Sequence, residues 1–436
     1  MSKYDVIIIG AGIMGAATAY ELAKKGYKVV VIEKNAQAGT GSTAGSCAIV
    51  RAHYSTYQGV AMAYEGFFYW LNWEDYLGVK DPEGMARYMN CGSILLKTKG
   101  HNYRKVLEHF RAAGVKHEEW TLEQLRENMP LYNHKAWWPP SRPEDTPDYW
   151  DREPTDTIDG AVFTPESGYV DRPDLATRNM IHAAKAHGAE LMTGRRVVQI
   201  HREGNRVQGV SLDNAERIDA PIVVNAAGPH SFIINRMAGI EEGMRIKTRA
   251  LRHEVHHVPS PPGFNFEHDG YHTSDGDNGI YFRPCVNNTI LVGSEDPKCD
   301  PQEWIENPDV FNREVTDAQW AAQVSRLVRR FTNMSMPEKK MGFAELYDVS
   351  DDWIPIYDKS DLDGFYLCIG TSGNQFKNGP VVGYCMSELI DRCEKGQDHD
   401  ADPVIVKAVY TGLELNMQQY SRRREINPES SFSVNG

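Results

Sequence analysis

The sequence of 436 residues is long enough for two or three domains with substantial cores. Its formal net charge of −13 disfavours a nucleic-acid partner, because neutralising phosphates requires a basic surface. The seven cysteines are scattered and none has C-x-x-C spacing, which argues against a disulfide framework and against a zinc site. The sequence has no signal-peptide pattern and no apolar run of about 18 residues, so we expect a cytoplasmic protein with no membrane span.

The first 33 residues have the pattern of a dinucleotide-binding unit. The residues before Gly10 form a β-branched run that is typical of a strand buried on both faces of a parallel sheet. Gly10 permits a tight turn, Gly12 lets the backbone approach a pyrophosphate, and Gly15 lets the following helix pack closely. A second buried strand at 29–32 ends in Glu33, whose carboxylate is placed to bind a ribose. The acid disfavours NADP, whereas FAD and NAD both remain open on this stretch.

Three later segments have small residues beside a strand or a helix start. The stretch 39–48 directly follows the ribose-binding acid, and we expect its backbone and hydroxyls to contact a cofactor; the alternative is a flexible surface loop. The segments 222–231 and 364–380 each repeat the order of buried strand, glycine turn and helix. The dinucleotide-binding domain is therefore expected to be discontinuous in sequence.

The Trp- and Pro-rich stretch 133–159 is too irregular for a regular element, and we interpret it as an excursion that crosses between domains or covers a site, or else as a solvated insertion. We expect the arginines of helix 319–334 to face solvent, and the tail 401–436 to hold one helix and a polar end. The other predicted elements are the helices 57–76, 102–113, 122–129 and 174–187, the strand 92–97, the strand pair 191–200 and 206–211, and the antiparallel strands 245–258, 279–284 and 289–293.

A histidine-rich strand raises the question of a metal. His256 and His257 are adjacent, so on a strand their side chains point to opposite faces, and no further ligand near His253 completes a recognisable set. We therefore predict no metal site.

In its strand, glycine and helix junctions, the chain resembles the D-amino-acid oxidase superfamily of FAD enzymes. Within that superfamily it resembles the sarcosine oxidase and dimethylglycine dehydrogenase-like amine oxidoreductases. The resemblance extends over about residues 4–389. The pieces that carry it, in family order, are 5–33, 41–51, 166–171, 224–229, 281–284 and 363–377.

The resemblance implies an α/β fold, in which a Rossmann-like FAD-binding domain is interleaved with a substrate domain built on a mostly antiparallel sheet. We expect the FAD-binding domain to comprise 1–88, 155–237 and 340–400. The substrate domain would comprise 89–154 and 238–339, and 401–436 would form a C-terminal tail.

The resemblance also implies which residues contact the cofactor. Glu33 is similar to the acid that binds the adenosine ribose, and Val197 to the residue whose backbone meets the adenine. The full set of predicted cofactor contacts is Gly10, Gly12, Gly15, Glu33, Lys34, Ser42, Thr43, Ser46, Cys47, Val197, Ala227, Gly228, Gly370, Ser372, Gly373, Asn374, Gln375, Phe376 and Lys377.

Three residues are implied to be catalytic. Arg51 matches an arginine that pairs with the substrate carboxylate, Lys377 a lysine near the flavin that assists it, and Tyr281 a tyrosine lining the substrate pocket. A guanidinium offers a carboxylate a rigid fork of donors, which agrees with that role. The alternatives are a structural salt bridge for Arg51 and a solvated helix-start lysine for Lys377.

Two positions depart from the monomeric sarcosine oxidase pattern. Glu345 stands where that pattern has a cysteine attached to the flavin, so we expect FAD to be bound without a covalent link. Leu291 stands where we align its oxygen-activating lysine, so the electron acceptor, O2 or an electron carrier, stays open.

Taken together, these features predict an FAD-dependent oxidoreductase that oxidises the C–N bond of a small amino acid or N-methylated amine carrying a carboxylate, giving an imine that hydrolyses. Its partners would be that small molecule and the electron acceptor, and an oligomer is possible. The alternatives are an FAD-dependent hydroxy-acid or glycerol-3-phosphate-type dehydrogenase, and an FAD-containing assembly or scaffold protein without turnover.

Overall fold

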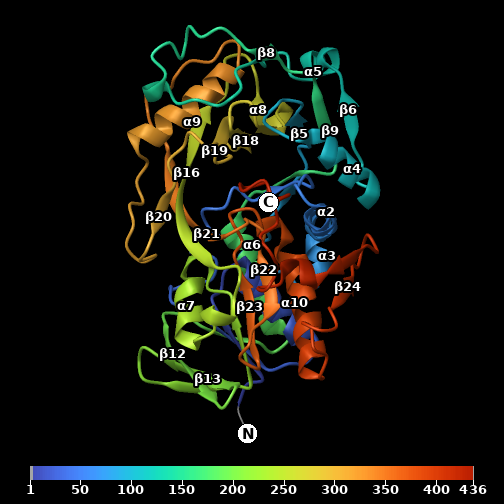
Figure 1. Cartoon of the computed structure of the whole chain (residues 1–436), viewed down its shortest axis with the longest axis vertical. Helices are drawn as coiled ribbons and strands as arrows, with labels where there is room; N and C mark the ends of the chain where they lie inside the picture. The colour runs from blue at the N-terminus through green and yellow to red at the C-terminus, as the bar shows by residue number, and fades with distance from the viewer. Residues whose placement is uncertain (1–2, 436) are drawn as a thin grey trace.

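Two sheets organise the computed structural model, which describes residues 3–435, into a lower and an upper part (Figure 1). The lower sheet has six strands, parallel except at one edge, where β22 is antiparallel to β23. In spatial order the strands are β11 (Glu190–Met192), β2 (Val29–Ile32), β1 (Val6–Ile9), β15 (Ile222–Asn225), β23 (Phe365–Ile369) and β22 (Ile356–Lys359).

Both faces of this sheet are buried, which explains its continuous β-branched strands. Side chains alternate along a strand, so Val6 and Ile8 join one hydrophobic core while Ile7 and Ile9 join another. Five helices contribute to the first core, and a small sheet and one helix contribute to the second. The helices of the first core are α1 (Ile13–Lys24), α2 (Tyr57–Leu71), α3 (Trp73–Leu77), α6 (Pro173–Ala186) and α10 (Gly379–Glu394). The second core contains β12 (Val197–Glu203), β13 (Arg206–Leu212), β14 (Arg217–Asp219) and α7 (Ser231–Ala238).

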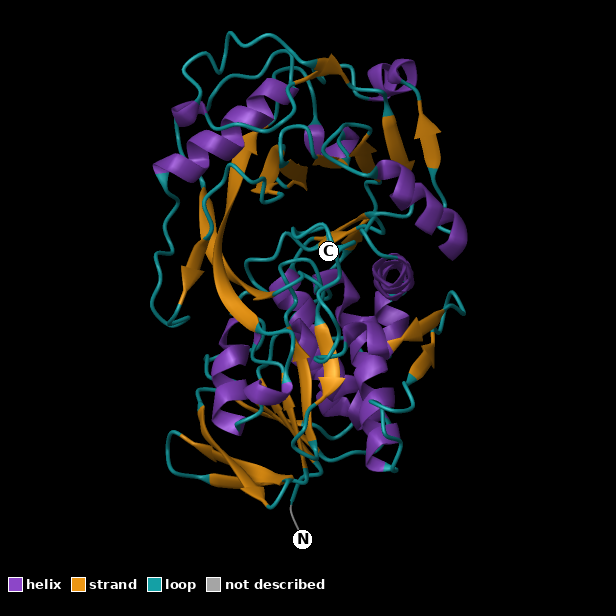
Figure 2. Cartoon of the chain, in the orientation of Figure 1, coloured by secondary structure: helices purple, strands orange, loops and turns teal. Residues whose placement is uncertain are grey.

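The upper sheet has nine strands and is antiparallel except where β17 pairs with β5. Its strands along the sheet are β20 (Glu303–Ile305), β16 (Thr248–Pro259), β19 (Thr289–Ser294), β18 (Ile280–Cys285), β17 (His272–Asp275), β5 (Ser93–Leu96), β9 (Ala161–Thr164) and β6 (Glu118–Trp120), and β21 (Gly342–Ser350) pairs with β16 off this path. The predicted α/β fold with a second, mostly antiparallel sheet is thereby confirmed. The long β16–β21 pair extends from the upper part down to the lower one (Figure 2).

Helix α9 (Asp317–Arg330) lies against the upper sheet, and the prediction that its arginines face solvent is wrong. Arg330 is fully buried and pairs with Asp275 at 2.7 Å and with Asp277 at 3.1 Å. Arg326 is buried too, and pairs with Asp300 at a distance of 2.6 Å. A buried guanidinium is tolerated because these carboxylates neutralise it and satisfy its donors.

The expected strand 191–200 is in fact two elements, because residues 193–196 leave the edge of the lower sheet before β12 begins. The helix expected in the tail is also wrong: the segment forms the hairpin β24 (Ile405–Lys407) and β25 (Glu414–Asn416) and the 3-10 helix η5 (Met417–Tyr420). The end of the tail is polar as expected, but Ser433, Val434 and Asn435 are buried, and Figure 1 shows the C-terminus at the centre of the molecule, between the two sheets.

The remaining elements complete the surface and the junction between the two parts. They are β3 (Ile49–Val50), β10 (Gly168–Val170) and β4 (Tyr88–Met89) in one small sheet, β7 (Lys135–Ala136) and β8 (Asp156–Thr157) in another, the helices α4 (Tyr103–Ala113), α5 (Leu122–Asn128) and α8 (Phe266–Asp269), and the 3-10 helices η1 (Pro143–Asp145), η2 (Gly228–His230), η3 (Glu241–Gly243) and η4 (Phe376–Asn378). Within residues 3–435, no helix combines the length and the apolar character needed to cross a bilayer.

Candidate active site

The glycine turn after β1 leaves no room for a side chain at Gly10 or at Gly15. Gly10 has a φ of +104°, and a Cβ there would lie 2.4 Å from the carbonyl oxygen of Ala226, which directly follows the neighbouring strand β15. A Cβ on Gly15 would lie 2.0 Å from the Gly10 carbonyl oxygen. These glycines therefore let the turn, the start of α1 and the end of β15 approach one another.

Glu33 closes this turn from the second strand. Its carboxylate is buried, with Oε2 accepting from the Ala11 amide at 2.9 Å and Oε1 accepting from the Asn35 amide at 2.8 Å. Each carboxylate oxygen can accept further hydrogen bonds. The side chain therefore holds the turn in shape and still faces the cavity beside it.

We call that cavity the dinucleotide cavity. It lies along the carboxyl ends of β1, β2 and β15, where open α/β sheets bind their ligands. Nine of the predicted cofactor residues line it: Gly10, Gly12, Glu33, Lys34, Ser42, Thr43, Val197, Ala227 and Gly228.

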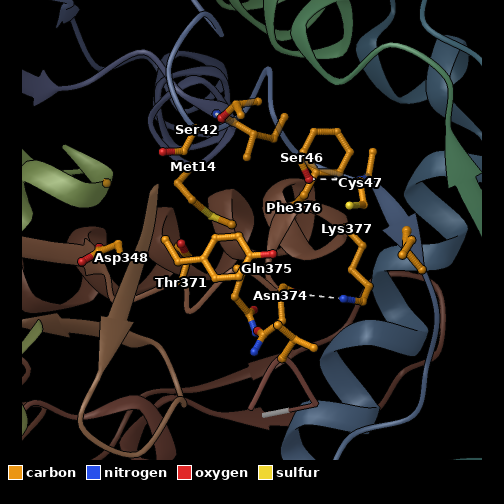
Figure 3. A pocket seen from close by; sticks show the side chains of 18 of the residues that line it. Met14, Ser42, Ser46, Cys47, Asp348, Thr371, Asn374, Gln375, Phe376 and Lys377 are labelled. Atoms are coloured by element: carbon orange, nitrogen blue, oxygen red, sulfur yellow. Dashed lines mark hydrogen bonds between the residues drawn. The ribbon is translucent and has the colours of Figure 1, made fainter. Parts of the chain in front are cut away.

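A second cavity, the inner pocket, continues from the first towards the upper sheet. The two share lining residues that include Gly12, Ser42, Thr43 and Gly228. The predicted residues that line the inner pocket alone are Ser46, Cys47, Arg51, Tyr281, Gly373, Asn374, Gln375, Phe376 and Lys377. Figure 3 shows Phe376 and Lys377 beside Ser46 and Cys47, with Asn374 and Gln375 next to them and Met14 and Ser42 on the other side.

Three predicted residues line neither cavity. Gly15 packs behind the turn. Gly370 donates its amide to Asp348 at 2.6 Å, and Ser372 is fully buried with its hydroxyl donating to the Gly370 carbonyl oxygen at 3.1 Å. These residues shape the loop that carries the pocket residues after β23.

Arg51 and Lys377 are the two cations of the inner pocket, and both are buried. Arg51 donates to the carbonyl oxygens of His53 and Val434, the latter at 2.7 Å. Lys377 Nζ donates to Tyr54 Oη at 2.7 Å and to the Asn374 carbonyl oxygen at 2.6 Å. Within residues 3–435 neither forms an ion pair with a carboxylate.

Burial and mutual repulsion perturb both cations. Burial lowers the pKa of Arg51. Burial, followed by the charge of Arg51, holds the pKa of Lys377 well below its ordinary value. Two buried cations without a carboxylate make this end of the pocket attractive to an anion.

Tyr281 stands on β18 across the pocket. Its hydroxyl lies 3.2 Å from Cys47 Sγ and 3.5 Å from Tyr347 Oη. Burial, with Cys47 as the next cause, raises the pKa of Tyr281 well above 10, so the phenol stays protonated and can donate or accept.

Two buried histidines that the sequence did not single out for the site lie beside Arg51. His53 and His272 stack with their ring centroids 5.9 Å apart. His272 lines the inner pocket. Its Nδ1 is 2.7 Å from Ser93 Oγ, whereas its Nε2 has no hydrogen-bond partner within residues 3–435. Burial, followed by the charge of Arg51, lowers the pKa of both imidazoles well below 6.5, so both are neutral at neutral pH.

Asp348 and the end of the tail are the other residues that sequence reasoning missed. Asp348 is buried, accepts from Ser231 Oγ at 2.8 Å, and has its pKa raised by burial to about 7. Val434 and Asn435 line the inner pocket from the C-terminal segment. An acid at the end of a strand was a usable signal for Asp348, but no local pattern marks a polar tail as a pocket wall.

This fold and this pair of joined cavities define a dinucleotide-binding oxidoreductase. The reactive end of the dinucleotide would meet a pocket between the two sheets. The family model described as FAD dependent oxidoreductase matches residues 5–389. The chain belongs to this family of FAD-dependent oxidoreductases, the D-amino-acid oxidase superfamily predicted from the sequence, and FAD is its cofactor.

Two of its relatives are distant in sequence but match along most of their length. The sarcosine oxidase beta subunit of Rhodobacter capsulatus is 25% identical over 403 residues, covering 89% of this chain and 85% of the relative. Glycine oxidase of Geobacillus kaustophilus is 22% identical, covering 91% and 95%. The crystal structure of L-proline dehydrogenase from P. horikoshii superposes with a TM-score of 0.74 at 21% identity, covering 97% of each chain, which is a likeness of fold.

The residues present fit FAD. The glycine turn leaves backbone amides at the start of α1, where a pyrophosphate binds best. The two cavities are continuous, as an extended dinucleotide requires. In the inner pocket, Asn374 is buried and its Nδ2 has no partner within the described residues, which leaves a donor for a bound group.

Proposed function

We propose that this enzyme oxidises the C–N bond of a small amino acid or N-methylated amine that carries a carboxylate. The observation that supports the proposal best is the pair of buried cations, Arg51 and Lys377, that lack a carboxylate partner within residues 3–435. A substrate carboxylate would supply the missing negative charge. The names of the sarcosine oxidase and glycine oxidase relatives, which act on small amino acids, agree with this class.

Arg51 would orient the substrate. Two of its N–H groups are held by backbone carbonyls, which fix the plane of the guanidinium and leave other donors for a carboxylate. A charge-assisted hydrogen bond contributes about 1.5–3 kcal/mol. Lys377, fixed by Tyr54 and Asn374, would add to the same positive field.

The other end of the substrate must lose its charge before it reacts. FAD, when bound, supplies the acceptor for a hydride equivalent from the carbon next to the nitrogen. The amine must be neutral for this transfer, and the neighbouring cations disfavour an ammonium group in the pocket. His272 Nε2 can accept a hydrogen bond from the neutral amine when Nδ1 carries the ring proton towards Ser93. The imine product then hydrolyses in water.

Anaerobic titration tests the proposal. We expect sarcosine, dimethylglycine, proline or a related amine to bleach the flavin absorbance, and carboxylate-free amines to do so only at much higher concentration. Bleaching by hydroxy acids or glycerol 3-phosphate, with none by the amines, would favour the hydroxy-compound dehydrogenase. No bleaching across the whole panel would contradict turnover and favour a scaffold role.

The flavin is proposed to be bound without a covalent link. Glu345, at the position of the flavin-attaching cysteine, lines the dinucleotide cavity and pairs with Arg313 at 2.9 Å. Acid precipitation is expected to release all of the FAD into the supernatant. Flavin that stays with the precipitated protein would contradict this.

A further inference from the structure

A third cavity, which we call the side cavity, lies on the far side of the C-terminal segment from the inner pocket. Asn435 lines both cavities, and His53 and Tyr54, next to the Arg51 region, line the side cavity as well. Trp138 and Pro140 of the irregular stretch 133–159 cover part of it. Asn435 therefore belongs to the walls of both the inner pocket and the side cavity.

Three residues that line the side cavity each have a buried acceptor oxygen with no hydrogen-bond partner within residues 3–435. These oxygens are Oε1 of Glu295, Oδ2 of Asp296 and Oδ1 of Asn435. Glu295 is only 7% exposed and Asn435 only 9% exposed. An acceptor left without a donor at this depth costs roughly 1–3 kcal/mol, and more when it is charged, so these oxygens favour a ligand that brings donors.

The neighbouring basic side chains do not bond these three oxygens. His101 Nε2 is 2.8 Å from the other carboxylate oxygen of Glu295, and His253 Nε2 is 3.0 Å from the other oxygen of Asp296. Lys105 and Glu429 both line the cavity and pair with each other at 3.1 Å, and Lys298 lines it as well.

The chemistry of the lining selects the ligand. An ammonium group brings two or three N–H donors and a positive charge, which match two carboxylate oxygens and one amide oxygen. A carboxylate or phosphate would bring only further acceptors. The inner pocket has the opposite preference, because it is lined by Arg51 and Lys377, and burial raises the pKa of its lining acid, Asp348, to about 7.

We propose that the side cavity binds the ammonium form of an amine, and that it is the waiting site from which the substrate reaches the inner pocket. The second half of this proposal rests on the proposed function. Small amines are protonated in neutral water, whereas the cations of the inner pocket disfavour that form. A cation site directly behind Asn435 would concentrate the amine beside the pocket in which it reacts.

The binding test uses two small probes, each of which carries only one of the two charged groups of the substrate. Methylammonium carries only the cation and acetate only the anion, and both are titrated into the FAD-loaded full-length enzyme at constant ionic strength, by calorimetry or by NMR of labelled probe. We expect E295Q to weaken methylammonium binding at least tenfold and to leave acetate binding unchanged. N435A, which removes a neutral acceptor near the chain end, is expected to weaken methylammonium binding severalfold.

The matched control is E74Q, which removes the same charge from an exposed acid that pairs with Lys80 and does not line the side cavity, and it is expected to leave methylammonium binding unchanged. Equal methylammonium affinity in the wild type, E295Q and N435A would overturn the proposal, as would no methylammonium binding to the wild type. FAD content and the unfolding temperature identify a variant that has not folded, in which case N435A decides. If E295Q weakens methylammonium binding but no amine bleaches the flavin, the ammonium site stands and the proposed function fails.

Discussion

The guanidinium of Arg51 donates to the carbonyl oxygen of Val434 at 2.7 Å, although 383 positions separate them in the sequence. The C-terminal segment is therefore a wall of the inner pocket and not an appendage. Ser430 anchors the segment by donating to the carbonyl oxygen of Asp352 at 2.5 Å. Because two backbone carbonyls orient Arg51, the pocket depends on the fork geometry of arginine and not only on its charge.

Replacing Arg51 by lysine tests that dependence. Lysine keeps the charge but cannot hold both carbonyls and a carboxylate in one plane. We expect R51K to raise the KM for a carboxylate-bearing amine about 10- to 100-fold, which corresponds to one charge-assisted hydrogen bond, and to change kcat less. Steady-state kinetics with an amine that lacks the carboxylate is the comparison, since its KM is expected to change little. R87K, at an exposed arginine paired with Asp171, is the matched control. Equal KM changes for both amines would refute the role of Arg51.

The strand, glycine and helix junctions were predictable because each is a local pattern. Gly10, Gly228 and Gly373 all stand within a few residues of a buried strand, and the structure brings all three to the joined cavities. Resemblance then placed Arg51 and Lys377 in one pocket. Neither step required knowing a contact between distant parts of the chain.

What could not be predicted depends on partners far apart in sequence. Arg330 looks like a surface residue until Asp275 is seen beside it, 55 positions away. The charged tail likewise looks solvated until Arg422 is seen buried against Asp358, at 2.9 Å. Composition reports that such residues are charged, but only the tertiary structure supplies the opposite charges that allow their burial.

The lowered pKa of Lys377 predicts how anion binding changes with pH. Only the protonated Lys377 side chain attracts a carboxylate. Burial, together with the charge of Arg51, makes Lys377 lose its proton well below pH 10.5. We therefore expect the Kd of a non-reacting carboxylate, read from the flavin spectrum, to increase as the pH rises through that depressed value. K377Q is expected to bind the carboxylate more weakly at neutral pH and to show no such dependence on pH. A wild-type Kd that is constant up to pH 10 would contradict the assignment.

Asp348 predicts a pH dependence of stability. Its pKa is about 7 in the folded chain because of burial, against an ordinary value of 3.8. Between these values the folded state holds a proton that the unfolded state has lost, so this group makes stability fall as the pH rises from about 4 to about 7. D348N keeps the shape and can still bond Gly370 and Ser231. We expect its unfolding temperature to fall less over this interval than that of the wild type. Parallel curves for the two proteins would show that Asp348 is ionised in the folded state.

Gly10 provides the sharpest test of the cofactor site. An alanine Cβ would meet the Ala226 carbonyl oxygen at 2.4 Å, so the turn and β15 must move apart and the pyrophosphate amides lose their arrangement. We expect G10A to purify without FAD, or with an FAD affinity lowered by two or more orders of magnitude, as measured by fluorescence titration of the apoprotein. G204A is the control, because Gly204 also has a positive φ, +58°, but a Cβ there meets nothing within 4 Å. It is expected to cost about 1 kcal/mol of stability from backbone strain and to retain FAD. If both variants lose FAD equally, the close approach of Gly10 to Ala226 is not the reason that glycine is needed there.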